Sequence, residues 1–229
     1  MAKSALKLKA RAFRKQGKSI REIVGLTGIP ISTVSLWCRD IKLSKAQKMR
    51  LISKERSPSY AGRMLAAERA KLGRLMLIKQ LKREGVGDIG KITDREFFLS
   101  GIGLYWGEGY RSQEMVGFTS KDAQIIKFIM AWFKKFLNIG NKDFILRISL
   151  NNNHKNRIKA VTGYWERSTG IPCLQFTKTS LIKTAQNKIY EKPENYYGTL
   201  RITVRKSRNM HRKLMGWIEG LYKSVVSWT

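Results

Sequence analysis

Apolar residues recur at helical spacing through the first part of the chain. The pattern predicts three short helices, over about residues 4–16, 20–26 and 32–41. Ser19 followed three residues later by Glu22 is a capping-box pattern for the second helix, and Ser32 is expected to cap the third. Two short helices joined by a tight turn that contains glycine are typical of a helix-turn-helix unit. We therefore place a first domain at residues 1–43.

Residues 44–93 are expected to be mainly helical and are strongly basic. The run Ser-Pro-Ser at 57–59 is predicted to divide them into helices over about 45–55 and 60–84. The second helix carries an apolar stripe, made by Met64, Leu65, Leu72, Leu75, Met76 and Leu81. Three glycines, Gly85, Gly87 and Gly90, predict a flexible joint after it. We interpret this segment as a connector whose positive charges lie along a phosphate backbone.

Residues 94–229 alternate between helical and strand patterns. Helices are expected over about 95–108, 121–137, 155–169 and 209–225, and strands over about 115–119, 143–150, 173–179 and 198–205. Asp94 and Ser120 are the expected caps of the first two helices. The resulting order, α-β-α-β-α-β-β-α, predicts an α+β domain with a mostly antiparallel sheet.

Composition narrows the class of partner. The chain has 46 Lys and Arg against 16 Asp and Glu, a net charge of +30, so a polyanion is the expected partner. Nucleic acid is favoured over a membrane because there is no apolar run of transmembrane length and no lipidation motif. The many aromatic residues argue against a disordered basic tail. Two cysteines without a CxxC pattern and no apolar leader predict a cytoplasmic, nucleoid-associated protein.

The segment KSIREIVGLTGIPISTVSLWCRD, residues 18–40, resembles the helix-turn-helix of resolvases and transposases. The resemblance implies that the helix beginning at Ser32 enters the major groove of double-stranded DNA. Its polar, outward-facing residues are then the expected DNA contacts: Ser32, Thr33, Ser35 and Arg39.

Four glycines and one acid stand out between Gly101 and Gly109. A glycine costs about 1 kcal/mol against alanine in a helix interior, so four in so short a helical segment need a physical reason. Close packing of two helices is such a reason, because a missing side chain lets the backbones approach. The segment places a single carboxylate, Glu108, at the end of that contact.

The sequence FFLSGIGLYWGEG, residues 97–109, resembles the LAGLIDADG motif of homing endonucleases, and residues 115–137 resemble the strand and helix that follow the motif. The resemblance implies a saddle-shaped sheet and a pair of packed motif helices. Gly103, Gly107 and Tyr105 would then lie at the helix interface, and Glu108 would be the catalytic acid and ligand of Mg²⁺ or another divalent cation. Trp106 stands where the family has its first acid.

The resemblance also implies that the sheet follows the major groove of the DNA. The basic and polar residues expected to contact DNA from the sheet and its loops are Arg111, Gln113, Arg147, Gln175, Lys178, Arg201 and Arg205. A second motif-like stretch at 213–220 leaves too few residues after it for a second sheet. One motif per chain implies a homodimer with a nearly palindromic target.

Three functions remain open at this level. The leading hypothesis is a site-specific, metal-dependent DNA endonuclease. The first alternative is a DNA-binding transcription regulator on the same fold that does not cleave, which the absence of an acid at Trp106 favours. The second is an intron RNA-binding splicing helper, which ranks last because the strands carry few outward aromatic residues. The acid could also be an incidental solvent-exposed residue beside a purely structural helix contact.

Overall fold

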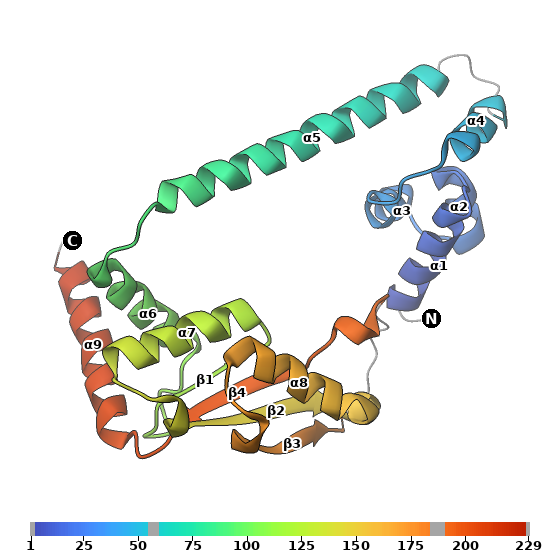
Figure 1. Ribbon diagram of the computed structural model, residues 1–229. Helices are drawn as coiled ribbons and strands as arrows, with labels where there is room; N and C mark the ends of the chain where they lie inside the picture. Colours follow the sequence, from blue (N-terminus) through green and yellow to red (C-terminus); the bar gives the residue numbers. More distant parts are fainter. Residues whose placement is uncertain (1–2, 55–59, 184–190, 228–229) are drawn as a thin grey trace. The chain divides into compact units, whose positions relative to one another are not determined.

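The computed structural model describes residues 3–54, 60–183 and 191–227 of the chain (Figure 1). The protein is α+β, with helices throughout and one four-stranded sheet in the part described. It divides into two compact units, Met1–Gly90 with Asn187–Pro193, and Lys91–Gln186 with Glu194–Thr229. None of the helices in the described ranges combines the length and apolar character needed to cross a bilayer. The three-part domain division expected from the sequence stays a prediction.

The first unit begins with three helices around a small core. These are α1 (Lys3–Lys15), α2 (Ile20–Thr27) and α3 (Ile31–Cys38). Their shared core consists of Ala10, Ile23, Ile29, Val34 and Cys38. The predicted capping box is confirmed, because the Glu22 backbone N–H donates to Ser19 Oγ and the Ser19 N–H donates to the Glu22 carboxylate. This box fixes where α2 begins.

The predicted cap of helix α3 was wrong. The helix begins at Ile31, directly after Pro30, and Ser32 lies within its first turn. Proline is suited to this end of a helix because its ring fixes φ and because it lacks an N–H that would go unpaired there. Pro30 therefore sets the start of α3 without a side-chain cap.

Two further helices complete the first unit, α4 (Lys45–Lys54) and α5 (Tyr60–Ile89). The predicted break at 57–59 lies outside the described residues. The predicted joint was placed too early, since α5 continues through Gly85 and Gly87 and the left-handed φ of 56° occurs at Gly90. Two glycines cost a helix only about 1 kcal/mol each, which the remainder of a long helix outweighs.

The second unit has the predicted order of elements. In sequence they are α6 (Asp94–Glu108), β1 (Gly117–Ser120), α7 (Ala123–Phe136), β2 (Phe144–Asn151), α8 (Ile158–Thr169), β3 (Phe176–Ile182), β4 (Thr199–Val204) and α9 (Arg208–Val226). Short 3₁₀ turns at 152–157 and 173–175 precede α8 and β3. The expected starts at 155 and 173 were therefore too early.

Two predicted helix caps in this unit were also wrong. Thr93 caps α6, in a capping box with Glu96, so Asp94 is the first helical residue. Asp122 caps α7 by accepting a hydrogen bond from the Gln124 backbone N–H. Several neighbouring residues with short polar side chains suited the cap in each case, and the sequence alone does not choose between them.

The sheet is mixed, with strand order β1-β4-β2-β3. Strand β4 pairs antiparallel with both β1 and β2, whereas β2 and β3 are parallel. The expectation of a mostly antiparallel sheet thus holds for two of the three pairings. Helix α8 lies between β2 and β3 in the chain, and a crossover of this kind is what a parallel pair requires.

One face of the sheet is covered by α7 and α8 (Figure 1). The alternating residues predicted for β2 do face this core: Phe144, Leu146, Ile148 and Leu150 are buried. Large aromatic residues of the helices, including Trp132 and Trp165, belong to the same core. Residues in the intervening strand positions, such as Arg147 and Arg201, are exposed on the other side, here called the open face.

Candidate nucleic-acid interface

Helix α6 packs on α7 through a glycine. A Cβ added at Gly101 would lie 2.0 Å from the indole ring of Trp132, so no larger residue fits there without moving the ring. The Trp132 Nε1–H donates to the Phe98 carbonyl at 3.0 Å, which holds the indole in place. This glycine therefore serves packing within one subunit.

The glycines on the other side of α6 have no such role. Gly103 and Gly107 are exposed, and a Cβ at either position would meet no atom within 4 Å. They leave a side of the helix without side chains and free of contacts in the subunit. They remain the predicted interface residues.

Tyr105, the third predicted interface residue, is fully buried in its own subunit. Its hydroxyl donates to the Tyr110 carbonyl at 2.8 Å, and burial raises its pKa to about 12. The side chain is thus a core residue and is not available to a partner. The motif pattern assigned Tyr105 to the helix interface, whereas its side chain is buried in the core of the same unit.

Glu108 is the last residue of α6 and is exposed. No hydrogen bond or ion pair joins it to another residue in the part of the chain that is described. The next residue must be glycine, because a Cβ at Gly109 would lie 2.6 Å from the Tyr105 ring. The backbone after Glu108 is therefore constrained, while the Glu108 side chain is exposed to solvent.

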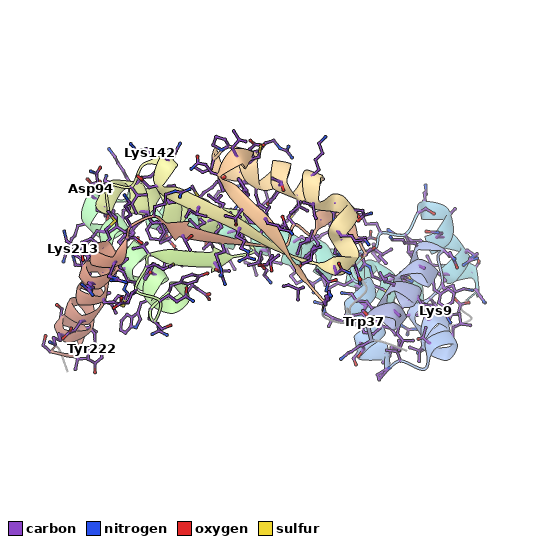
Figure 2. The ribbon with its side chains drawn as sticks, turned by 90° about the horizontal axis from the view of Figure 1, so that it is seen from below. Lys9, Trp37, Asp94, Lys142, Lys213 and Tyr222 are labelled. Atoms are coloured by element: carbon purple, nitrogen blue, oxygen red, sulfur yellow. The ribbon has the colours of Figure 1, made fainter. Side chains whose placement is uncertain are left out.

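Trp106 is partly exposed and meets helix α9. Its ring contacts that of Tyr222 edge to face, with centroids 6.4 Å apart. Tyr222 lies toward the end of α9 (Figure 2). The residue that replaces the first acid of the motif thus has a packing contact of its own.

The described residues do not by themselves form a metal-binding cluster. Among the described residues, no three His, Cys, Asp or Glu side chains come together as a possible metal-binding group. Glu108 supplies one carboxylate at a helix C-terminus, where the last backbone carbonyls lack helical partners and the dipole favours a cation. Such oxygen donors are of the kind that a hard cation such as Mg²⁺ prefers.

No family model, curated protein or solved structure matches the chain.

The open face of the sheet brings together two of the predicted DNA contacts. Arg147 of β2 and Arg201 of β4 are direct cross-strand partners, and both are exposed. Thr119 of β1 pairs with Arg201, and Thr177 of β3 pairs with Arg147. The four residues form a row across all four strands.

The other predicted DNA contacts of the second unit lie outside this row of four residues. Gln175 lies in a 3₁₀ turn, and its side-chain amide donates to the carbonyls of Asn141 and Phe144. Its amide thus ties that turn to the start of β2. The remaining four are exposed, on the loop after α6, within β3 and just after β4: Arg111, Gln113, Lys178 and Arg205.

Tyr110 belongs to this surface, although no sequence pattern selects it. A Cβ added at Gly117 of β1 would lie 2.4 Å from the Tyr110 ring, so the ring rests on the strand at that glycine. Its hydroxyl is 2.7 Å from Thr119 Oγ1, and the Arg201 guanidinium carbon lies 5.5 Å from the ring centroid. The assignment depends on contacts between residues far apart in the chain, which no local pattern records.

Helix α3 presents a mixed exposed face in the first unit. Ser32, Ser35 and Arg39 are exposed, and Thr33 is half-buried. Leu36 has 57% of its surface exposed and lies between these polar residues on the helix. The face therefore offers hydroxyl groups, one guanidinium and an apolar group.

Arg11 fixes the far end of α3. Its guanidinium donates to the Trp37 carbonyl at 2.6 Å and to both carboxylate oxygens of Asp40, at 2.6 and 2.7 Å. These hydrogen bonds lower the pKa of Asp40 to about 2 and raise that of Arg11. Trp37, whose carbonyl accepts one of these hydrogen bonds, is labelled in Figure 2. The orientation of α3 relative to α1 is thus set by a charge-assisted, bidentate contact.

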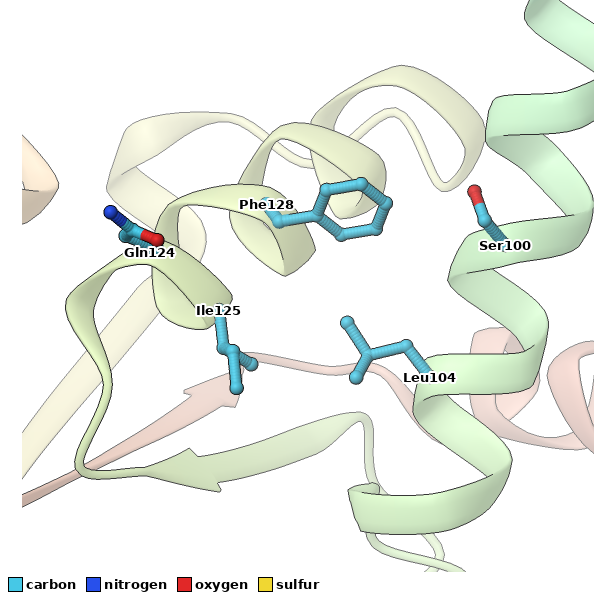
Figure 3. Close-up of a pocket in the computed structure, with 5 residues that line it drawn as sticks. All are labelled: Ser100, Leu104, Gln124, Ile125 and Phe128. Carbon is cyan, nitrogen blue, oxygen red and sulfur yellow. The ribbon is translucent and has the colours of Figure 1, made fainter. Parts of the chain in front are cut away.

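An apolar groove of about 320 Å³ lies between α6 and α7 (Figure 3). Ser100 and Leu104 line it from α6, and Gln124, Ile125 and Phe128 line it from α7. It offers one hydroxyl and one amide but no charged group, so it is not suited to bind a phosphate.

Proposed function

We propose that the protein binds double-stranded DNA as a homodimer and cleaves it at a divalent-metal site built from two copies of Glu108. The observation that carries this proposal is the two-sided character of α6. One side is packed on Trp132 through Gly101, while the other exposes Gly103 and Gly107 and ends on the exposed Glu108. Each exposed glycine costs a helix interior about 1 kcal/mol, and we take the two together to require a closely packed neighbour that offsets this cost.

A second copy of the same helix satisfies this requirement. In a two-fold dimer the same patch meets itself, so Gly103 and Gly107 of each subunit would face their counterparts. The two helices would then end side by side, with one Glu108 from each. This is the arrangement that the resemblance to LAGLIDADG enzymes implies.

The paired acids would hold the metal that one subunit cannot. Two Glu108 carboxylates and the free carbonyls at the helix ends are oxygen donors of the kind Mg²⁺ prefers. When bound, such a metal activates water and stabilises the leaving oxygen of a phosphodiester. The protein's own part is to place one exposed Glu108 at the end of each α6, where Gly109 lets the chain turn close to Tyr105.

DNA contacts are proposed on two surfaces. The open face of the sheet, with Arg147 and Arg201, would follow a groove, in keeping with the saddle implied by the family resemblance. Helix α3 would act as the recognition helix of a helix-turn-helix, with Ser32, Ser35 and Arg39 toward the bases. The net charge of +30 supports a nucleic-acid partner for both.

A non-catalytic DNA-binding regulator is the second candidate, and Trp106 favours it. This residue occupies the position of the first motif acid and packs on Tyr222. Each subunit therefore brings one carboxylate where the family brings two, which leaves less negative charge to hold a metal. The fold and the DNA contacts would be the same in both functions.

Cleavage of a plasmid library tests the proposal. Wild type should nick or cut a subset of sites with Mg²⁺ or Mn²⁺, and Glu108→Gln should bind the same DNA but cleave at least a hundredfold more slowly. Glu219→Gln, which removes an exposed acid of α9 paired with Lys223, is the matched control and should cleave normally. A wild type that binds a site tightly yet never cuts it with either metal would establish the regulator instead.

A further inference from the structure

The cross-strand pair of Arg147 and Arg201 places two like charges side by side. Directly opposed residues on one face of an antiparallel pair have Cβ atoms only about 5 Å apart, and like charges there are destabilising. Neither guanidinium has an acidic partner within the described ranges. The four strands contain no Asp or Glu to offset the charge. An anion bound between the two side chains would relieve this repulsion.

Tyr110 restricts the position of one member of the pair. The Arg201 guanidinium lies over its ring, a geometry that favours a cation. The ring is itself held by Thr119 at its hydroxyl and by Gly117 beneath it. Arg201 is therefore ordered before any ligand arrives, which lowers the entropic cost of binding.

The backbone of Tyr110 is equally constrained. Its N–H donates to the Gly117 carbonyl at 3.0 Å, and its carbonyl accepts from the Tyr105 hydroxyl at 2.8 Å. The buried His211 of α9 places Nε2 2.9 Å from the same carbonyl. Tyr110 follows Glu108 by two residues, so one anchored turn positions both the acid and the guanidinium.

We propose that Arg147 and Arg201 together bind one phosphodiester group of DNA on the open face, with Tyr110 as the positioning residue for Arg201. A phosphate fits better than a base edge because it brings the negative charge that relieves the repulsion between the two guanidiniums. Planar guanidinium groups also match the oxygens of a phosphate through paired hydrogen bonds. The inference rests on the proposed DNA binding and adds a backbone contact to it.

The loss of a phosphate contact and the loss of a base contact change DNA binding in different ways. Losing a phosphate contact weakens binding to all sequences alike and reduces the slope of log affinity against log salt by about one per contact. Losing a base contact changes preference at one position of the site instead. Binding of full-length Arg147→Gln and Arg201→Gln to a randomised duplex library, repeated over a salt series, therefore tests the inference.

Each variant should bind about tenfold or more weakly on every sequence, with a shallower salt slope. Each should remain folded, and Arg147→Gln should unfold at the same or a higher temperature than wild type because it removes the repulsion. Arg167→Gln is the matched control, since Arg167 is exposed on α8 over the covered face of the sheet. It should leave both affinity and slope close to those of wild type. A loss confined to one base pair, or variants no different from this control, would overturn the phosphate site.

Tyr110→Leu tests the positioning role. It should weaken binding severalfold in the wild-type background and have no further effect in Arg201→Gln, because its contribution passes through that guanidinium. Equal losses in the two backgrounds would contradict the coupling. If wild type itself binds no duplex DNA, the proposed function fails, and that outcome is distinct from a failure of the phosphate site alone.

Discussion

At the scale of single residues, the glycines of α6 differ by what surrounds them. Gly101 and Gly109 sit where a Cβ would strike the rings of Trp132 and Tyr105, so the subunit itself explains them. Gly103 and Gly107 have open space around them. Contacts within the described chain do not account for the second pair, and we propose that a second copy of α6 packs there.

Alanine substitutions separate the two kinds of glycine. Gly101→Ala should destabilise the fold by about 1–3 kcal/mol, because the indole must shift to admit a methyl group. Gly103→Ala should leave the fold intact, or stabilise the helix by up to about 1 kcal/mol, while raising the dimer dissociation constant at least tenfold. Urea unfolding and sedimentation equilibrium measure the two effects. A Gly103→Ala protein that dimerises like wild type would remove the role given to this glycine.

At the scale of elements, features that depend on residues close together in the chain could be predicted from the sequence. The alternation in β2 and the capping box of α2 appeared in the structure as expected. The predicted helix caps at Ser32, Asp94 and Ser120 were wrong. At each of these places a neighbouring residue takes the N-cap position instead, and the choice depends on the turn that precedes it. The mixed sheet and the place of Tyr110 could not be predicted, because both depend on pairings between distant segments.

The hydrogen-bonded carboxylates of the first unit make its helices sensitive to acid. Glu22 has its pKa lowered to about 2 by Lys54 and by the Ser19 backbone, and Arg11 lowers that of Asp40 to about 2. Their ordinary values are 4.5 and 3.8, so both groups stabilise the folded state above those values. That stabilisation is lost as the pH falls from about 4.5 toward 2.

Hydrogen exchange in the full-length protein measures this effect. Protection of the α2 and α3 amides, corrected for intrinsic exchange, should decline between pH 5 and pH 2.5. In Arg11→Gln the decline for α3 should be smaller, since the pKa of Asp40 would return toward its ordinary value. Identical declines in the two proteins would show that the Arg11 contact does not stabilise α3.

At the scale of the whole molecule, the chain joins a helical unit to an α+β unit, and basic residues are exposed on both. Each unit has one of the two proposed DNA surfaces: the exposed side of α3 in one, and the open face of the sheet in the other. The acid at the end of α6 is the feature that a simple DNA-binding protein would not need. Its function depends on whether a second subunit brings its own acid alongside.

Disulfide trapping at the end of α6 tests this pairing most directly. Glu108→Cys is made in a Cys173→Ser background, because Cys173 is exposed, whereas Cys38 is buried and its thiol pKa is raised by that burial. Cysteines that meet at a two-fold axis form a disulfide when their Cα atoms come within about 7 Å. Under mild oxidation at low protein concentration, Glu108→Cys should give a covalent dimer, and Glu219→Cys in the same background should not. A Glu108→Cys protein that stays monomeric, or that cross-links no faster than Glu219→Cys, would contradict the paired-acid site.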